Sequence, residues 1–148
     1  MKVAFFLIPK SELVCLNTKT TMRQALERME RHSYSAVPLI DQKGRYAGTI
    51  TEGDLLWKIK NSPGLDLAGM EKIFVRDIAC RAKNKAVQID SRIVDLLYLA
   101  SEQNFVPVVD DQDIFIGIVR RREIIEYCAD LISAVENGRT CQSNSAAD

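Results

Sequence analysis

AVPLIDQKGRYAGTITEGDLL, residues 36–56, decides the fold, because its pattern returns as FVPVVDDQDIFIGIVRRREII at residues 105–125. Pro38 and Pro107 are 69 positions apart, and the glycines that follow them keep the same separation. The two copies therefore align without a gap. Self-similarity of this kind is the signature of an internal repeat.

Each copy predicts a β-hairpin that leads into a helix. Short apolar runs on both sides of an acidic, polar turn indicate buried strands. We expect these strands at residues 37–40, 46–51, 106–109 and 115–119. Gly48 and Gly117 lie in the second strand of each hairpin, where two backbones, or a backbone and a ligand, come close together.

A further helix is predicted before each hairpin, because apolar residues recur there at i, i+3, i+4 and i+7. These stripes are Met22, Ala25, Leu26 and Met29 in the first copy, and Ile93, Leu96, Leu97 and Ala100 in the second. Thr20 or Thr21 is expected to cap the first helix, and Asp90 or Ser91 the second. The stripes are 71 positions apart rather than 69, so the second copy lacks two residues between helix and strand.

The remaining segments complete two units of strand, helix, strand, strand and helix. Short strands are expected at residues 12–16 and 87–89, and helices at 54–60, 75–78 and 121–135. We divide the chain into a first repeat at 1–64, a connector at 65–84, a second repeat at 85–135 and a disordered tail at 136–148. One unit alone cannot bury both faces of its sheet, but two units packed together can.

Composition excludes several classes of function. The 148 residues are 47% apolar, with 20 basic and 20 acidic residues, and this balance argues against a nucleic-acid or membrane surface. The first apolar run is too short for a membrane span and no signal-peptide cleavage site follows it, so we expect a cytoplasmic protein. His32 is the only histidine, and the four cysteines fit no zinc or redox spacing. We expect no metal, no cofactor and no catalysis.

The order of these features resembles a tandem pair of cystathionine-β-synthase (CBS) domains, also called a Bateman module. The shared pattern is a short strand, a helix, V-P-[LV]-[IV]-D, G-x-[IV]-T-x-x-D and a second helix, and it covers roughly residues 4–135. The resemblance implies an α+β fold of two βαββα repeats packed by pseudo-two-fold symmetry. The opening AFFLIPKSEL also resembles stand-alone bacterial CBS proteins, some of which bind cyclic di-AMP.

The resemblance implies a cleft between the repeats that holds an adenine nucleotide. Carried over by position, the residues around the base are Val14, Tyr34, Ser35, Ala36 and Val37, with Asp54 at the ribose and Thr51 at the phosphate. A carboxylate can accept two hydrogen bonds from a ribose diol, and helix-start amides favour phosphate. The alternative is a helix cap, since Thr-x-x-Asp is close to a capping box, and both roles can coexist.

The second copy departs from this pattern, because Arg120, Arg121, Arg122 and Glu123 replace the Thr-x-x-Asp motif. Its own nucleotide pocket is therefore in doubt. Our hypothesis is that Arg121 and Arg122 cross the cleft to phosphates bound at the first repeat, as the resemblance to cyclic di-AMP-binding members implies. The alternative is a solvated face on which Arg122 pairs with Glu126.

These features favour a regulatory module that binds AMP, ATP or cyclic di-AMP and passes the signal to an unidentified partner protein. A ligand that contacts both sides of the cleft favours one arrangement of the repeats. Helix faces in the family commonly form a dimer contact, so the resemblance also implies a homodimer. The alternatives are an assembly module without a nucleotide and, less favoured, a nucleotide-processing enzyme.

Overall fold

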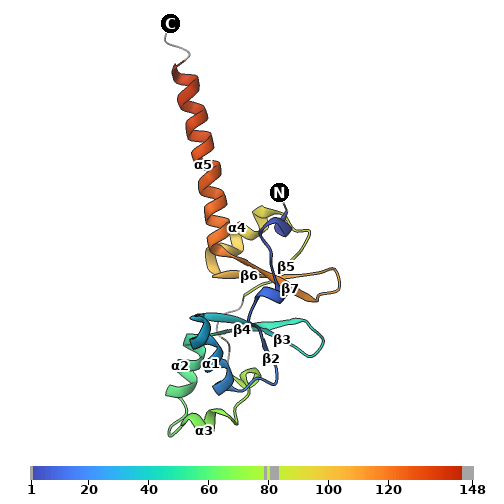
Figure 1. The fold of residues 1–148 in the computed structure, drawn as a ribbon, viewed down its shortest axis with the longest axis vertical. Coiled ribbons are helices and arrows are strands. Elements are labelled where there is room, and N and C mark those ends of the chain that lie inside the picture. The colour runs from blue at the N-terminus through green and yellow to red at the C-terminus, as the bar shows by residue number, and fades with distance from the viewer. Residues whose placement is uncertain (1, 79, 81–83, 145–148) are drawn as a thin grey trace.

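The computed structural model describes residues 2–78, 80 and 84–144, with side chains as far as residue 138 (Figure 1). The first half contains β1 (Ile8–Pro9), β2 (Leu16–Asn17), α1 (Met22–His32), β3 (Ala36–Ile40), β4 (Tyr46–Thr51), α2 (Glu52–Lys60) and α3 (Leu67–Met70). The second half contains β5 (Val87–Gln88), α4 (Ile93–Glu102), β6 (Phe105–Val109), β7 (Phe115–Arg120) and α5 (Arg121–Asn144). Single 3-10 turns lie at Val3–Phe6, Lys10–Glu12 and Val75–Asp77.

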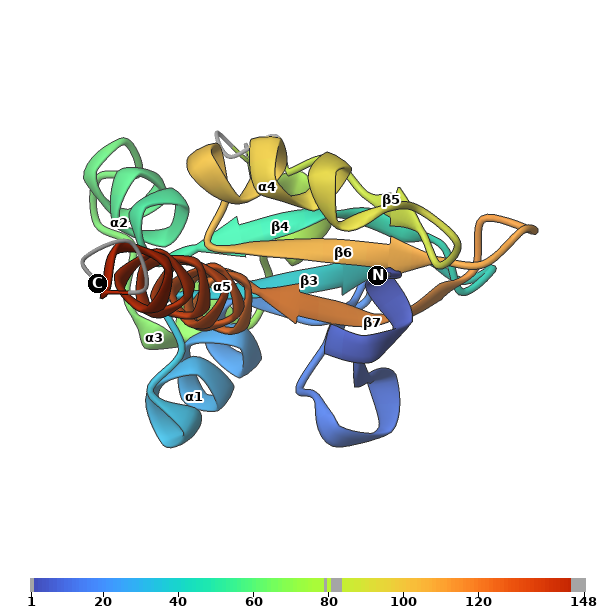
Figure 2. The ribbon, with the colours of Figure 1, turned by 90° about the horizontal axis from the view of Figure 1, so that it is seen from above.

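The two repeats build their sheets in the same way. One sheet has the strand order β2-β3-β4, and the other contains β5, β6 and β7 in the corresponding order with β1 added at its edge. Leu39 pairs with Gly48 and Val108 pairs with Gly117, and a bulge follows at the same place in both hairpins. Figure 2 shows β3, β4, β6 and β7 across the middle of the molecule, with α1 and α4 on opposite sides. The predicted α+β fold of two βαββα repeats is confirmed.

A pseudo-two-fold axis passes between the two hairpins. Arg45 and Ile114 occupy equivalent positions, 69 residues apart, and they form an antiparallel bridge with each other. The next equivalent pair, Tyr46 and Phe115, stacks with ring centroids 6.3 Å apart. Contact between equivalent residues is expected only at a two-fold axis, so the two repeats face each other around this apolar contact.

The N-terminal segment packs against the second repeat, not the first. β1 pairs antiparallel with β7, with Ile8 opposite Ile118, and Val3 is buried in the core formed by β5, β6, α4 and α5. The start of the segment that we assigned to the first repeat therefore lies against the second repeat. Hydrophobicity does not indicate which repeat the segment packs on, because a short apolar run suits either one.

Gly117 is required by the close approach of β1. A Cβ at this position would collide with the carbonyl oxygen of Ile8 and lie 2.8 Å from Cδ1 of Leu7. The predicted close approach is thus confirmed for Gly117. At Gly48 no other backbone comes close, because a Cβ there meets no protein atom within 4 Å, and the glycine has a φ of +148°.

We expect Gly117→Ala to lower the free energy of unfolding by about 1–3 kcal/mol, the usual cost of overpacking. Gly138→Ala is the matched control, since a Cβ there meets nothing and alanine is the better helix former. Urea denaturation of both variants tests this. Equal stability of Gly117→Ala and the wild type would show that β1 does not pack on β7.

The helices α1 and α4 end differently, and this explains the missing residues. Thr21 caps α1 through a capping box with Gln24, and Ser33 closes the helix in a left-handed conformation. α4 ends at Glu102, and Gln103 is already extended. The loop is therefore two residues shorter, as the spacing predicted. The predicted cap of α4 is wrong: Arg92, equivalent to Thr21, is the N-cap, and its amide donates to Asp95 at 3.1 Å.

α5 is longer than predicted. It runs from Arg121 to Asn144, so the expected disordered tail is wrong for residues 136–144, whereas 145–148 lie outside the described residues. Glycine and polar residues suggested a break, but one helical glycine costs only about 1 kcal/mol and no proline follows. Figure 1 shows α5 extending away from the body of the molecule.

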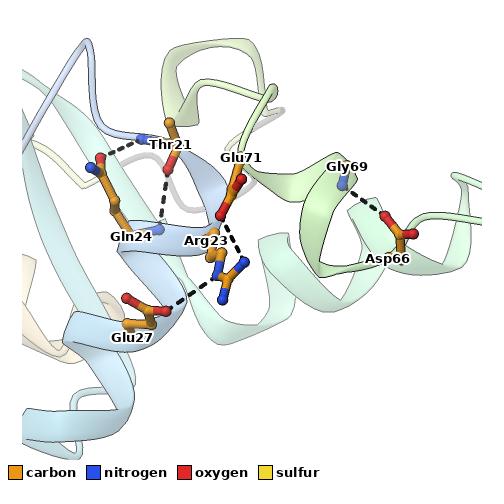
Figure 3. Close-up of polar contacts among 7 residues, drawn as sticks. All are labelled: Thr21, Arg23, Gln24, Glu27, Asp66, Gly69 and Glu71. Atoms are coloured by element: carbon orange, nitrogen blue, oxygen red, sulfur yellow. Dashed lines mark hydrogen bonds and ion pairs between the residues drawn. The ribbon is translucent and has the colours of Figure 1, made fainter.

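The connector packs on the first repeat through polar contacts as well as apolar ones. Figure 3 shows Arg23 of α1 between Glu27 and Glu71, with its guanidinium 2.7 Å from Oε1 of Glu71. Asp66 caps α3 by accepting a hydrogen bond from the Gly69 amide at 2.7 Å. The connector is therefore held to α1 by an ion pair as well as by apolar contacts.

Candidate ligand-binding site

A cleft of about 850 Å³ lies between the two repeats. This volume falls within the range of small-molecule sites, roughly 300–1,000 Å³. The first repeat and the preceding segment contribute Ile8, Glu12, Leu13, Val14, Tyr34, Ala36, Val37 and Pro38. The second repeat contributes Asn104, Phe105, Ile118, Arg120, Arg121, Arg122, Ile125 and Glu126. The wall is therefore mostly apolar, with polar groups concentrated at the start of α5.

Most of the predicted site residues line this cleft. Val14, Tyr34, Ala36 and Val37 lie on one side, and Arg121 and Arg122 lie on the other. Our hypothesis placed Arg121 and Arg122 across the cleft from the first repeat, and they line the same cleft as Val14 and Tyr34. Ser35, Thr51 and Asp54 are not among the lining residues. The residues predicted at the ribose and the phosphate therefore lie outside this cleft, which is lined by most of the residues predicted at the base.

Thr51 and Asp54 form a capping box at the start of α2. The amide and hydroxyl of Thr51 both donate to Oδ2 of Asp54 at 2.9 Å, and the Asp54 amide donates to the Thr51 hydroxyl at 3.2 Å. Asp54 is only 2% exposed. The capping interpretation is therefore confirmed. Together with burial, the negative charge of Asp54 raises the pKa of Cys80.

The arginines at the start of α5 have different hydrogen-bond partners. Arg121 donates from Nε to the carbonyl oxygens of Ala100 and Gln103, at 2.7 and 3.0 Å. Arg122 pairs with Glu126 at 2.9 Å, as the alternative interpretation of this helix predicted. Three arginines and two glutamates line the cleft, so its charge favours an anionic group on the ligand.

Glu123 is the counterpart of Asp54 in the second repeat. Its Oε1 accepts from Nε of Arg120 at 2.9 Å. Its Oε2 is buried, and no described residue donates a hydrogen bond to it. A buried carboxylate oxygen without a donor is costly, so a hydroxyl or amine placed here would be held favourably.

Four polar lining residues were missed by the sequence interpretation: Glu12, Asn104, Arg120 and Glu126. A signal for the last three existed in the repeat itself. In a two-fold arrangement, the first strand of one repeat faces the start of the last helix of the other. Positions near Arg121 could therefore have been grouped with Val14. Glu12 carried no such signal, since it lies in the 3-10 turn that follows β1.

Other types of site are not indicated in the part of the chain that the structure describes. No cluster of three or more His, Cys, Asp or Glu side chains there is arranged to hold a metal ion. No described helix is long and apolar enough to cross a membrane.

Comparison with known proteins gives the family. The CBS-domain family model matches residues 7–61 and 75–130. A CBS domain-containing protein of Dictyostelium discoideum is 26% identical over 141 residues, which cover 91% of this chain and 97% of the relative. An inosine-5'-monophosphate dehydrogenase of Methanocaldococcus jannaschii is 24% identical over 115 residues, 78% of this chain but only 21% of the dehydrogenase.

Solved structures share the fold. CbpB in complex with c-di-AMP superposes with a TM-score of 0.80 at 19% identity, covering 93% of this chain and 91% of CbpB. CBSX2 in complex with AMP has a TM-score of 0.69 at 23% identity, covering 88% of this chain and 97% of CBSX2. Identities this low show the fold alone. Because the family match covers most of the sequence, the chain belongs to the CBS-domain family and carries two CBS domains in tandem.

Proposed function

We propose that this protein is a regulatory module that binds an adenine nucleotide in the cleft between its two CBS domains. The observation that carries the proposal is the composition of that cleft: an apolar wall with Tyr34 on one side and three arginines on the other. The apolar wall suits a base, and the arginines suit phosphate. Cyclic di-AMP and AMP are the first candidates, because related folds are bound to them, and ATP follows.

Within this proposal, Val14, Tyr34, Ala36 and Val37 contact the base, and Arg121 and Arg122 contact phosphate. Ser35, Thr51 and Asp54 would serve a second cleft, related to the first by the internal two-fold axis. The proposed role of the module is binding and not catalysis. The ligand acts by favouring one arrangement of the two repeats, which a partner protein then recognises.

Thermal melting tests the proposal with AMP, ADP, ATP, S-adenosylmethionine, NAD and cyclic di-AMP, each at saturation. A ligand at about 100 times its dissociation constant adds roughly 2.7 kcal/mol to the free energy of unfolding, which moves the transition by several degrees. We expect one adenine compound to shift the melt. If none does, the competing function, an assembly module without a nucleotide, is favoured.

We also propose a homodimer in the cytoplasm. Exposed apolar side chains support the dimer: Leu56 and Ile59 on α2, Leu97 and Tyr98 on α4, and Leu131, Ile132 and Val135 on α5. Burying such surface drives association. Cys15, Cys80 and Cys128 are free thiols, as expected in a reducing compartment.

Ile132→Glu is expected to convert the dimer to a monomer, because it places a charge in the exposed apolar stripe of α5. Ser133→Glu is the matched control, since helical spacing puts this residue away from the stripe. Light scattering after gel filtration gives the mass of each variant. A monomeric wild type, or dissociation by both variants, would contradict the proposed role of the stripe.

A further inference from the structure

One guanidinium in the cleft is anchored before any ligand arrives. Nε of Arg121 donates to the carbonyl oxygens of Ala100 and Gln103, and its backbone amide donates to the carbonyl of Asn104 at 3.0 Å. The last carbonyls of a helix have no partner within the helix. Arg121 therefore closes the C-terminal end of α4, where a cation is favoured by the helix dipole.

The first repeat has the equivalent backbone bond, from the Glu52 amide to the Ser35 carbonyl at 3.0 Å, but among its described residues no side chain closes the end of α1 in this way. At the end of α1, the amides of Ser33 and Tyr34 donate to the carbonyls of Glu30 and Met29, because Ser33 is in a left-handed conformation. The second repeat is two residues shorter, and α4 passes directly into the extended Gln103. The position equivalent to Arg121 is Glu52, whose carboxylate cannot donate to a carbonyl.

Gln103, whose backbone carbonyl accepts from Arg121, is itself held by side-chain hydrogen bonds. It is a buried polar residue, 5% exposed. Its side-chain amide nitrogen donates to the carbonyls of Lys85 and Phe105 at 3.1 and 3.2 Å, and its oxygen accepts from the Lys85 amide at 2.8 Å. These three bonds fix the backbone of Gln103, and so the carbonyl that Arg121 uses.

We propose that Gln103 is a positioning residue for the anionic group of the cleft's ligand, and that it acts through Arg121. This inference rests on the proposed function. Guanidinium carries five N–H donors in a rigid fork, so Nε can stay on α4 while the terminal nitrogens hold a phosphate. A side chain held in place beforehand loses little rotamer freedom on binding. The same bonds connect the occupied cleft to Lys85, where the connector enters β5.

Titration calorimetry of a double-mutant cycle tests the inference, with cyclic di-AMP and AMP as probes. Gln103→Met keeps the side-chain volume but removes the three hydrogen bonds. We expect it to weaken binding about tenfold, and to have no further effect in an Arg121→Ala background. Gln88→Ala, an exposed amide on the neighbouring strand, is the control and should bind like the wild type. Wild-type affinity in Gln103→Met, or additive losses, would overturn the inference.

A second measurement needs no ligand. The Nε–Hε resonance of Arg121 in 1H–15N spectra should exchange slowly with water in the wild type and rapidly in Gln103→Met, whereas that of exposed Arg122 should exchange rapidly in both. If the two arginines behave alike in the wild type, Arg121 is not anchored and the inference fails. If the anchor is present but none of the adenine compounds of the melting experiment binds, the proposed function fails instead.

Discussion

Phe115→Ala is expected to lower the free energy of unfolding by about 3–5 kcal/mol, the usual cost of removing a buried phenyl ring. Phe115 is 1% exposed and stacks on Tyr46 at the two-fold contact between the repeats. The ring belongs to the apolar cluster that joins both halves, so its removal leaves a cavity between them. A loss of this size is a large fraction of the roughly 5–15 kcal/mol that stabilises most domains.

Urea denaturation followed by circular dichroism measures this loss, and Phe5→Ala is the control. Phe5 is 77% exposed, so its removal should change the free energy of unfolding by less than about 0.5 kcal/mol. The comparison is between two phenylalanine side chains of the same chain that differ in burial. An equal, small effect of both substitutions would show that the two repeats do not depend on each other at this contact.

Tyr34→Ala should weaken the binding of the adenine nucleotide by about fivefold to a hundredfold. The ring lines the cleft opposite the arginines, and aromatic contact with a base contributes about 1–3 kcal/mol. His32 stacks on Tyr34 with ring centroids 5.5 Å apart, which fixes the orientation of the ring. Titration calorimetry measures the effect with the nucleotide that the melting experiment selects.

Tyr98→Ala is the matched control, because Tyr98 is an exposed tyrosine on α4 outside the lining of the cleft. Its affinity should equal that of the wild type. If Tyr34→Ala binds as tightly as Tyr98→Ala, the base does not lie against this side of the cleft. Melting curves of both variants without ligand establish that each is folded.

Much of the fold could be predicted because the two repeats carry the same local signals. The strand alternation, the turn residues and the helical stripes appear twice, and the 69-residue spacing aligns the two hairpins residue by residue. Even the shortened loop after α4 was visible as a change of spacing. Short-range patterns of this kind depend on neighbouring residues, which a sequence shows directly.

Contacts between distant segments were not visible in the same way. The pairing of β1 with β7 brings Ile8 beside Ile118. A short apolar run has no feature that indicates which strand it pairs with. The cleft depends on the same kind of contact, since it opposes Val14 to Arg121 across the two repeats. The sequence hypothesis grouped Val14 with Arg121, Thr51 and Asp54, whereas the cleft brings together only the first two of these residues.

Chemical-shift mapping in 1H–15N spectra tests the central claim most directly, with cyclic di-AMP and AMP titrated separately. We predict that one of them shifts the amides of Val14, Tyr34, Ala36 and Arg121 together, because these residues line one cleft. Thr51 and Asp54 should stay unchanged until a second site fills. Shifts confined to Thr51 and Asp54, or no shifts with either nucleotide, would contradict the account.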